Sequence, residues 1–247
     1  MTSLGWTILF ALIAAAAVML GGLIVTLPTR LGARRLHHLI AFGAGFMLAA
    51  AFVSMVPESI ELTRFAPFWI LGGYVLAHLF EHAFTSHFHF GEETHAEHAV
   101  APGVSTSALV GLSLHAFFDG VAISVGFLIT PALGVFIALA VILHKIPEGV
   151  TIASVMLAAG AGKRRAMTAS AILALATLAG AVAMRQLDAW KGVALGLSCG
   201  IAVYVAATDL IPEINKRDER EFSVSALLGI LLYFGVFWLL RSLGLHG

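Results

Sequence analysis

Eight long apolar segments, separated by short polar or turn-rich stretches, constrain this chain more than any other feature of its sequence. A helix needs about 20 apolar residues to cross the ~30 Å hydrocarbon layer of a membrane. Only 11% of the residues are charged, whereas a soluble domain normally has about 25%. The segments run over residues 4–27, 38–60, 67–86, 104–129, 132–159, 166–184, 191–213 and 223–243. We therefore predict an all-α integral membrane protein with eight transmembrane helices.

The apolar residues are spread over the whole chain, so no stretch is long enough for a separate soluble domain. We predict a single transmembrane domain over residues 1–247, with a His-rich cytoplasmic loop at about 86–103. Nucleic acid is not expected as a partner. One cysteine, Cys199, lies in an apolar run, so neither a disulfide framework nor a cysteine-based zinc site can form.

The basic residues divide unequally between the two sides of the predicted bundle. Nine lie in one set of loops, at Arg30, Arg34, Arg35, Lys163, Arg164, Arg165, Lys216, Arg217 and Arg220. Four lie on the opposite side, at Arg64, Arg185, Lys191 and Arg241. The positive-inside rule then places both termini on the outer face of a cell membrane. The fourteenth basic residue, Lys145, lies in the middle of a span.

Two spans end in matching sequences, which indicates an internal repeat. Residues 55–58 read Met-Val-Pro-Glu and residues 210–213 read Leu-Ile-Pro-Glu, and aligning them also superposes Gly45 on Gly200. The second and seventh spans run in opposite directions, so the repeat is inverted, as in transporters that expose one midplane site to each side in turn. With the fourth and fifth spans as a central pair, this predicts a 3+2+3 arrangement. Chance matches in an Ala/Gly/Leu-rich chain are the alternative.

The central pair carries two matching sets of polar side chains. His115 and Asp119 are four residues apart on one predicted helix, and His144 and Glu148 are four apart on the next, so each pair shares a helix face. At 1.5 Å per residue, both imidazoles lie roughly 17 Å deep, near the midplane. Two carboxylates at that depth require a cation. Buried histidines bonded to their own carboxylates are the alternative.

The mixture of imidazole and carboxylate groups limits which cations fit. It suits Zn²⁺, Fe²⁺, Mn²⁺ or Co²⁺ better than Ca²⁺ or Mg²⁺, which prefer oxygen ligands alone. Pro147 leaves the Leu143 carbonyl without its usual helical donor, so the helix can bend there or direct an oxygen into the cavity.

These motifs resemble the ZIP (Zrt/Irt-like) family of metal transporters, and their prokaryotic members in particular. The fourth span of that family typically reads His-Asn-x-x-Asp/Glu-Gly and the fifth reads His/Gln-Glu/Asp-x-x-Glu-Gly, and residues 115–120 and 144–149 match these patterns except at the second position of each. The resemblance covers essentially the whole chain. It implies that His115, Asp119, His144 and Glu148 bind the transported metal.

Three departures from the family pattern bear on how many ions are bound. Ala116 replaces an asparagine, Lys145 replaces a carboxylate, and the sixth span, 166–184, contains no acidic residue. Each change removes part of the second metal position that some relatives have. We therefore expect one transport metal, with the Lys145 ammonium replacing the second. The alternative is that Lys145 extends toward a water-filled vestibule.

Other polar residues suggest a route through the membrane. Glu58 and Glu61 lie at the outer end of the second span and suggest an entrance. A possible inner release route is formed by His78, Glu81, His82, Asp209 and Glu213. The loop residues 87–98 include four histidines and three glutamates, which could collect metal weakly or form a simple polar linker.

The sequence thus predicts transport of a divalent transition metal into the cytoplasm, with Zn²⁺ favoured and Fe²⁺, Mn²⁺, Co²⁺ or Cd²⁺ as other candidates. The expected partners are that ion, the lipid bilayer and, as one option, a second copy in a homodimer. We expect no cofactor and no enzymatic activity. A membrane-embedded zinc hydrolase is one alternative, although the HExxH motif is absent. A metal efflux carrier of the cation diffusion facilitator type is the other.

Overall fold

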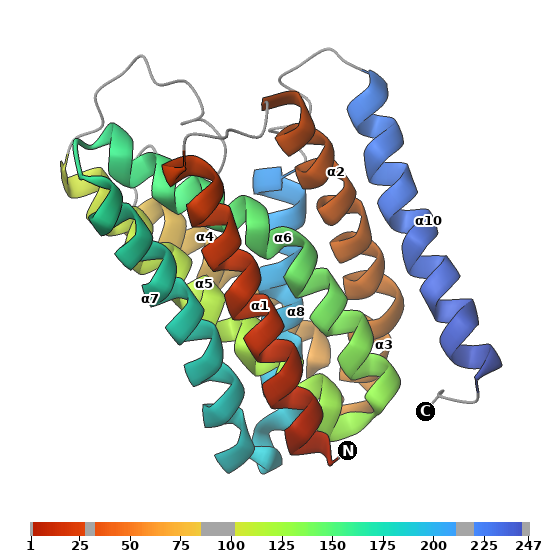
Figure 1. Ribbon diagram of the computed structural model, residues 1–247. Coiled ribbons are helices and arrows are strands. Elements are labelled where there is room, and N and C mark those ends of the chain that lie inside the picture. The colour runs from red at the N-terminus through yellow and green to blue at the C-terminus, as the bar shows by residue number, and fades with distance from the viewer. Residues whose placement is uncertain (1, 28–32, 85–101, 211–219, 244–247) are drawn as a thin grey trace.

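The computed structural model describes residues 2–27, 33–84, 102–210 and 220–243, and every regular element in those ranges is a helix (Figure 1). The long helices are α1 (Ser3–Thr26), α2 (Ala33–Ala50), α4 (Ala66–Phe84), α5 (Pro102–Ile129), α6 (Pro131–Ala158), α7 (Lys163–Ala183), α8 (Lys191–Tyr204) and α10 (Arg220–Ser242). The short ones are η1 (Ala51–Met55), α3 (Val56–Leu62), η3 (Met184–Gln186), η4 (Asp188–Trp190) and η5 (Val205–Leu210).

The helices confirm the predicted all-α membrane fold. Seven stretches are long and apolar enough to cross a membrane, and α4 adds a shorter apolar helix over Ala66–Phe80. The second span consists of α2, η1 and α3 in succession, and the seventh consists of α8 and η5. The predicted boundaries of the spans therefore agree with the helices to within a few residues.

The second and seventh spans also deviate from α-helix at the same place. Each contains a π-helical segment, η1 ending at Met55 and η5 ending at Leu210. Those two residues coincide in the alignment of the two Pro-Glu sequences, although the π-helix itself could not be predicted from it. Because π-helices are rare, their occurrence at matching positions supports the inverted repeat.

Helix packing follows the same symmetry. The first helix of the first repeat, α1, packs on α6, and the first helix of the second repeat, α7, packs on α5. In the same way, α2 packs on α10 and its counterpart α8 packs on α4. In each of these four contacts, glycines let two helix backbones touch. Each contact has one glycine on either helix, placed against the backbone of the other: Gly21 and Gly149, Gly120 and Gly180, Gly45 and Gly229, and Gly73 and Gly200.

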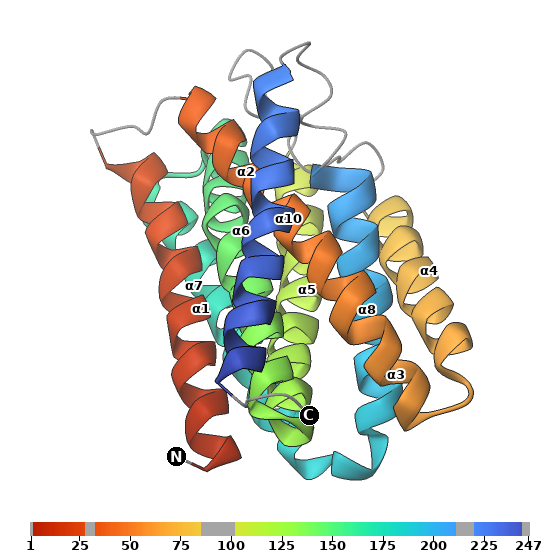
Figure 2. The same cartoon turned by 90° about the vertical axis from the view of Figure 1, so that its right-hand side faces the viewer.

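These close contacts divide the helices into two groups. The first is a four-helix bundle of α1, α5, α6 and α7, in which a Cβ atom on Gly149 would lie only 2.0 Å from the Val18 carbonyl oxygen. The second consists of the flanking pairs α2/α10 and α4/α8 (Figures 1 and 2). Across the boundary, the tightest contact among the described glycines is looser, since a Cβ on Gly43 of α2 would lie 3.3 Å from the Leu143 carbonyl oxygen of α6. At the described glycines, the helix backbones therefore approach each other less closely across this boundary than they do within either group.

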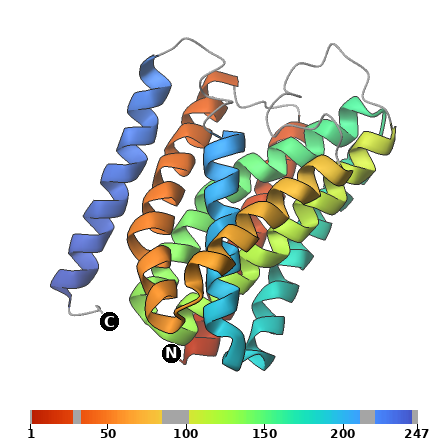
Figure 3. The same ribbon diagram turned by 180° about the vertical axis from the view of Figure 1, so that it is seen from behind.

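The charged ends of the helices agree with the predicted grouping of basic residues. The N-terminal end of α1 and the C-terminal end of α10 lie at the same end of the molecule (Figure 1), where Arg185 and Arg241 also lie. Arg34, Lys163 and Arg220 lie at the opposite end, where α2, α7 and α10 begin. Figure 3 shows α10 at the edge of the molecule, and only 11% of the 18-residue apolar window of this helix is buried. The His-rich loop lies almost entirely outside the described residues.

Candidate metal centre

A tight hairpin brings the two polar helices into register. Only Thr130 separates α5 from α6, and its hydroxyl caps α6 by accepting a hydrogen bond from the Leu133 N–H at 3.1 Å. Pro131 occupies the first helical position, where its missing N–H has no cost. His115 and His144 each lie thirteen residues after the start of a 28-residue helix. Because the helices are antiparallel, both histidines lie at half the length of the hairpin, as predicted.

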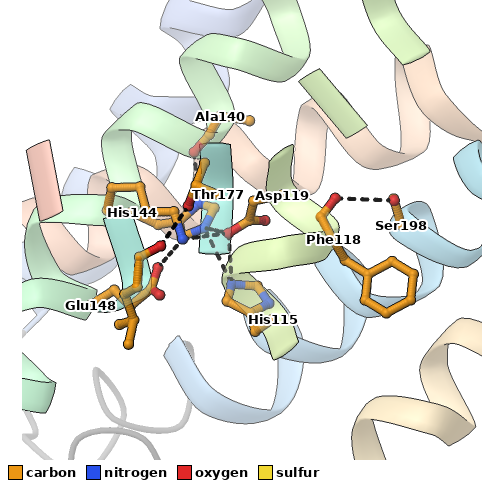
Figure 4. Close-up of polar contacts among 10 residues, drawn as sticks. His115, Phe118, Asp119, Ala140, His144, Glu148, Thr177 and Ser198 are labelled. Atoms are coloured by element: carbon orange, nitrogen blue, oxygen red, sulfur yellow. Dashed lines mark hydrogen bonds and ion pairs between the residues drawn. The ribbon is translucent and has the colours of Figure 1, made fainter. Parts of the chain in front are cut away.

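Three donor atoms form a nearly equilateral triangle at this depth (Figure 4). The Nε2 atoms of His115 and His144 are 3.3 Å apart, and the Oδ2 atom of Asp119 lies 3.2 Å from each of them. Ligands about 2.0 to 2.2 Å from a tetrahedral Zn²⁺ are separated by about 3.3 to 3.6 Å. The triangle therefore has nearly the size of one face of a zinc tetrahedron.

A backbone carbonyl orients the ring of His144. Its Nδ1 lies 2.8 Å from the Ala140 carbonyl oxygen, which can only accept a hydrogen bond, so Nδ1 is the donor. This bond directs Nε2 toward the other two corners of the triangle, 3.3 Å from His115 Nε2 and 3.2 Å from Asp119 Oδ2. Nε2 is therefore placed to bind a metal ion together with those two atoms.

Glu148 completes the set of four. Ligand atoms from His115, Asp119, His144 and Glu148 all lie within 4.8 Å of one another, and the last three residues are buried. Among the described residues, the Oε1 atom of Glu148 is buried and has no hydrogen-bond partner. A buried carboxylate oxygen without a donor is costly, so this atom is available as a fourth ligand.

Lys145 lies inside the site. Its side chain is fully buried, and its Nζ donates to Asp119 Oδ2 at 2.7 Å and to Glu148 Oε2 at 2.5 Å. The side chain therefore does not extend toward a vestibule, and the structure favours the reading in which the ammonium accompanies the ligands. The contact with Asp119 could not be predicted from the sequence, because it depends on how α5 and α6 face each other.

The proline in α6 frees a carbonyl at the boundary between the helix groups. The helix continues through Pro147, and the Leu143 oxygen lies against Gly43 of α2.

The role of the Ala140 carbonyl, which orients His144, was not predicted from the sequence. The general tendency of metal-binding histidines to donate their second N–H to a carbonyl or carboxylate could have suggested it.

The other predicted site residues whose side chains the structure describes are not part of this cluster. Glu58 and Glu61 line a cavity of about 440 Å³ between α3, α6 and α10, together with Arg241. His78 is exposed on α4, with its ring 5.9 Å from that of Tyr204. The side chains of Glu81, His82 and Asp209, and the whole of Glu213, lie outside the described residues.

Comparison with known proteins gives a consistent picture. The model of the ZIP zinc transporter family matches residues 103–241, which include both polar helices. The chain is 23% identical to the zinc transporter ZIP13 of Mus musculus, over 85% of this chain and 70% of that protein. It is 32% identical to zinc transporter ZIP4 of Rattus norvegicus and 27% identical to zinc transporter SLC39A7 of Homo sapiens. These two matches cover 51% and 47% of this chain, but only 20% and 27% of the respective relatives.

Proposed function

Because the chain belongs to the ZIP zinc transporter family, whose members are transporters rather than enzymes, we propose that it carries Zn²⁺ into the cytoplasm through His115, Asp119, His144 and Glu148. The observation that carries the proposal is the triangle formed by His115 Nε2, His144 Nε2 and Asp119 Oδ2, with Glu148 beside it. The relatives matched above are named zinc transporters, and the donor set and the triangle size suit zinc. Family membership favours transport over the hydrolase alternative.

The direction of transport and the orientation in the membrane are part of this proposal. The excess of basic residues at the end opposite the termini supports a cytoplasmic location for that end. Both termini then face outward. Movement of the metal into the cytoplasm, and not out of it, is what distinguishes this proposal from the alternative of an efflux carrier.

The division of the helices supports alternating access by an elevator motion. All four ligands lie on α5 and α6, inside the four-helix bundle that glycine contacts hold together. Across the boundary, Ser198 of α8 donates a long hydrogen bond of 3.3 Å to the Phe118 carbonyl of α5 (Figure 4). The bundle can therefore carry the site past the flanking pairs as one body.

We further propose that the site holds one ion, because Lys145 replaces a second. A second divalent ion beside Glu148 would lie close to the ammonium, and at an effective dielectric constant of ~20 a contact between +2 and +1 charges at 4 Å costs roughly 8 kcal/mol. Ala116, which is fully buried, offers no ligand atom in its side chain.

We propose the cavity lined by Glu58 and Glu61 as the outer entrance for the metal. The proposed inner route consists of His78, Glu81, His82, Asp209 and Glu213.

Metal uptake tests this function directly. Cells that produce the protein should accumulate radioactive zinc faster than cells with an empty vector, and purified protein in liposomes should take up Zn²⁺ while leaving Ca²⁺ and Mg²⁺ outside. Competition by Fe²⁺, Mn²⁺, Co²⁺ and Cd²⁺ would rank the ions. Faster loss of zinc from preloaded cells would instead identify an exporter, and no metal-dependent flux in either system would contradict transport.

A further inference from the structure

The polar groups of the site have an unusual balance of charge. Asp119 and Glu148 each contribute one negative charge, and Lys145, held between their oxygens, contributes one positive charge. With neutral imidazoles, the net charge of the site is therefore −1 when it is empty. One divalent ion changes the net charge to +1. The site thus carries a single net charge in both states.

On the basis of the proposed transport function, we infer that Lys145 is the built-in counter-ion that allows the empty site to return across the membrane. A carrier that performs net uptake must move its site twice in each cycle, once with metal and once without. Metal neutralises the carboxylates on the first passage. On the second passage, the Lys145 ammonium, which contacts both carboxylates, can do so.

The energetic argument depends on the square of the charge. The cost of placing a charged group in a low-dielectric medium rises with the square of its net charge, so an empty site at −2 is far more costly to move than one at −1. Without the Lys145 charge, the loaded site would be neutral and its passage would not be hindered. Loss of this charge should therefore slow the empty return specifically.

The geometry allows Lys145 to serve in both states. Its Nζ bonds to Glu148 Oε2, whereas the other oxygen of that carboxylate, Oε1, is the one without a partner among the described residues. Metal can therefore bind at Oε1 while the ammonium stays on Oε2. The contact with Asp119 Oδ2, at 2.7 Å, is the one that a metal would compete for. Since Lys145 and Glu148 lie on the same helix, the counter-ion moves with the site.

Comparison of two transport modes tests this inference. Net uptake into liposomes without internal metal requires the empty return, whereas exchange of external radioactive zinc for internal unlabelled zinc does not. Both rates should be measured with the membrane potential held at zero by a potassium ionophore and equal potassium on both sides. For Lys145→Gln and Lys145→Met we expect the ratio of net uptake to exchange to fall about tenfold or more, with exchange retained.

A matched control and a charge-preserving variant sharpen the test. Lys163→Gln removes a lysine from the exposed start of α7 and should leave the ratio unchanged. Lys145→Arg keeps the positive charge beside Glu148 and leaves all four ligands in place, so the ratio should stay near the wild-type value. A role that depends on the shape of the lysine side chain and not on its charge predicts instead that Lys145→Arg behaves like Lys145→Gln.

The possible outcomes separate this inference from the proposed function. A wild-type ratio in folded Lys145→Gln and Lys145→Met, or equal loss of both modes, would overturn the role of Lys145 while leaving transport established by the wild-type protein. Absence of both modes in the wild type would instead contradict the proposed function. If the two neutral variants do not fold, folded Lys145→Arg decides, because a low ratio in a variant that keeps the charge overturns the inference.

Discussion

Replacing His144 with alanine, or Glu148 with glutamine, should reduce zinc uptake to background. His144 supplies the Nε2 atom at one corner of the donor triangle, and Glu148 supplies a buried oxygen that has no hydrogen-bond partner among the described residues. Loss of a residue that merely supports a metal ligand typically weakens binding ten- to a hundredfold, so loss of a ligand itself should cost at least about a hundredfold. Zinc uptake and equilibrium zinc binding by the purified variants measure both effects.

The control for this prediction is His38→Ala. His38 lies near the start of α2, where its Nδ1 is 2.8 Å from the Ser225 hydroxyl of α10, and it is not part of the cluster of four ligands. This variant should retain most of the zinc uptake. Near-normal uptake by properly folded His144→Ala or Glu148→Gln protein would show that transport uses another site.

Replacing Gly149 with alanine should disrupt both folding and transport. The added Cβ would lie 2.0 Å from the Val18 carbonyl oxygen, and that atom belongs to the backbone of α1 and cannot rotate away. Overpacking of this kind typically costs about 1 to 3 kcal/mol, and more where backbone must move. Gly149 directly follows Glu148, so any separation of α1 from α6 also displaces a ligand. Thermal unfolding in detergent and zinc uptake are the measurements.

Gly235→Ala is the matched control, because Gly235 also lies within a helix, in α10, but has no atom within 4 Å of its hypothetical Cβ. Alanine favours helix over glycine by up to about 1 kcal/mol, so this variant should be as stable as the wild type or slightly more so. If Gly149→Ala and Gly235→Ala behave alike, the close contact between α1 and α6 is not what holds the bundle together.

Much of the fold could be predicted from the sequence, because a membrane imposes a simple length rule. Apolar stretches of about 20 residues define the spans, and the spacing of four residues in His115/Asp119 and His144/Glu148 places each pair on one helix face. The connection between α5 and α6, which consists of Thr130 alone, then brings the two faces together. The cluster of four was therefore accessible from local spacing and predicted depth.

Other features depend on tertiary packing that no local pattern reveals. The contact of Lys145 with Asp119 joins two helices, and its presence follows from the rotation of α5 relative to α6. The same holds for the glycines, since composition shows that they are numerous but not which backbone each one meets. For Gly120 the partner is the Thr177 carbonyl of α7. The π-helical segments likewise had no sequence signal beyond the repeat itself.

The central claim is that one divalent ion binds between α5 and α6. The most direct measurement is anomalous X-ray scattering from crystals of the wild-type protein grown with zinc. We expect one ion at half the length of the hairpin, about 2.0 to 2.2 Å from nitrogen or oxygen atoms of His115, Asp119, His144 and Glu148, with Lys145 still bonded to Glu148. Two fully occupied ions at that depth, or an ion bound away from these four residues, would contradict the account.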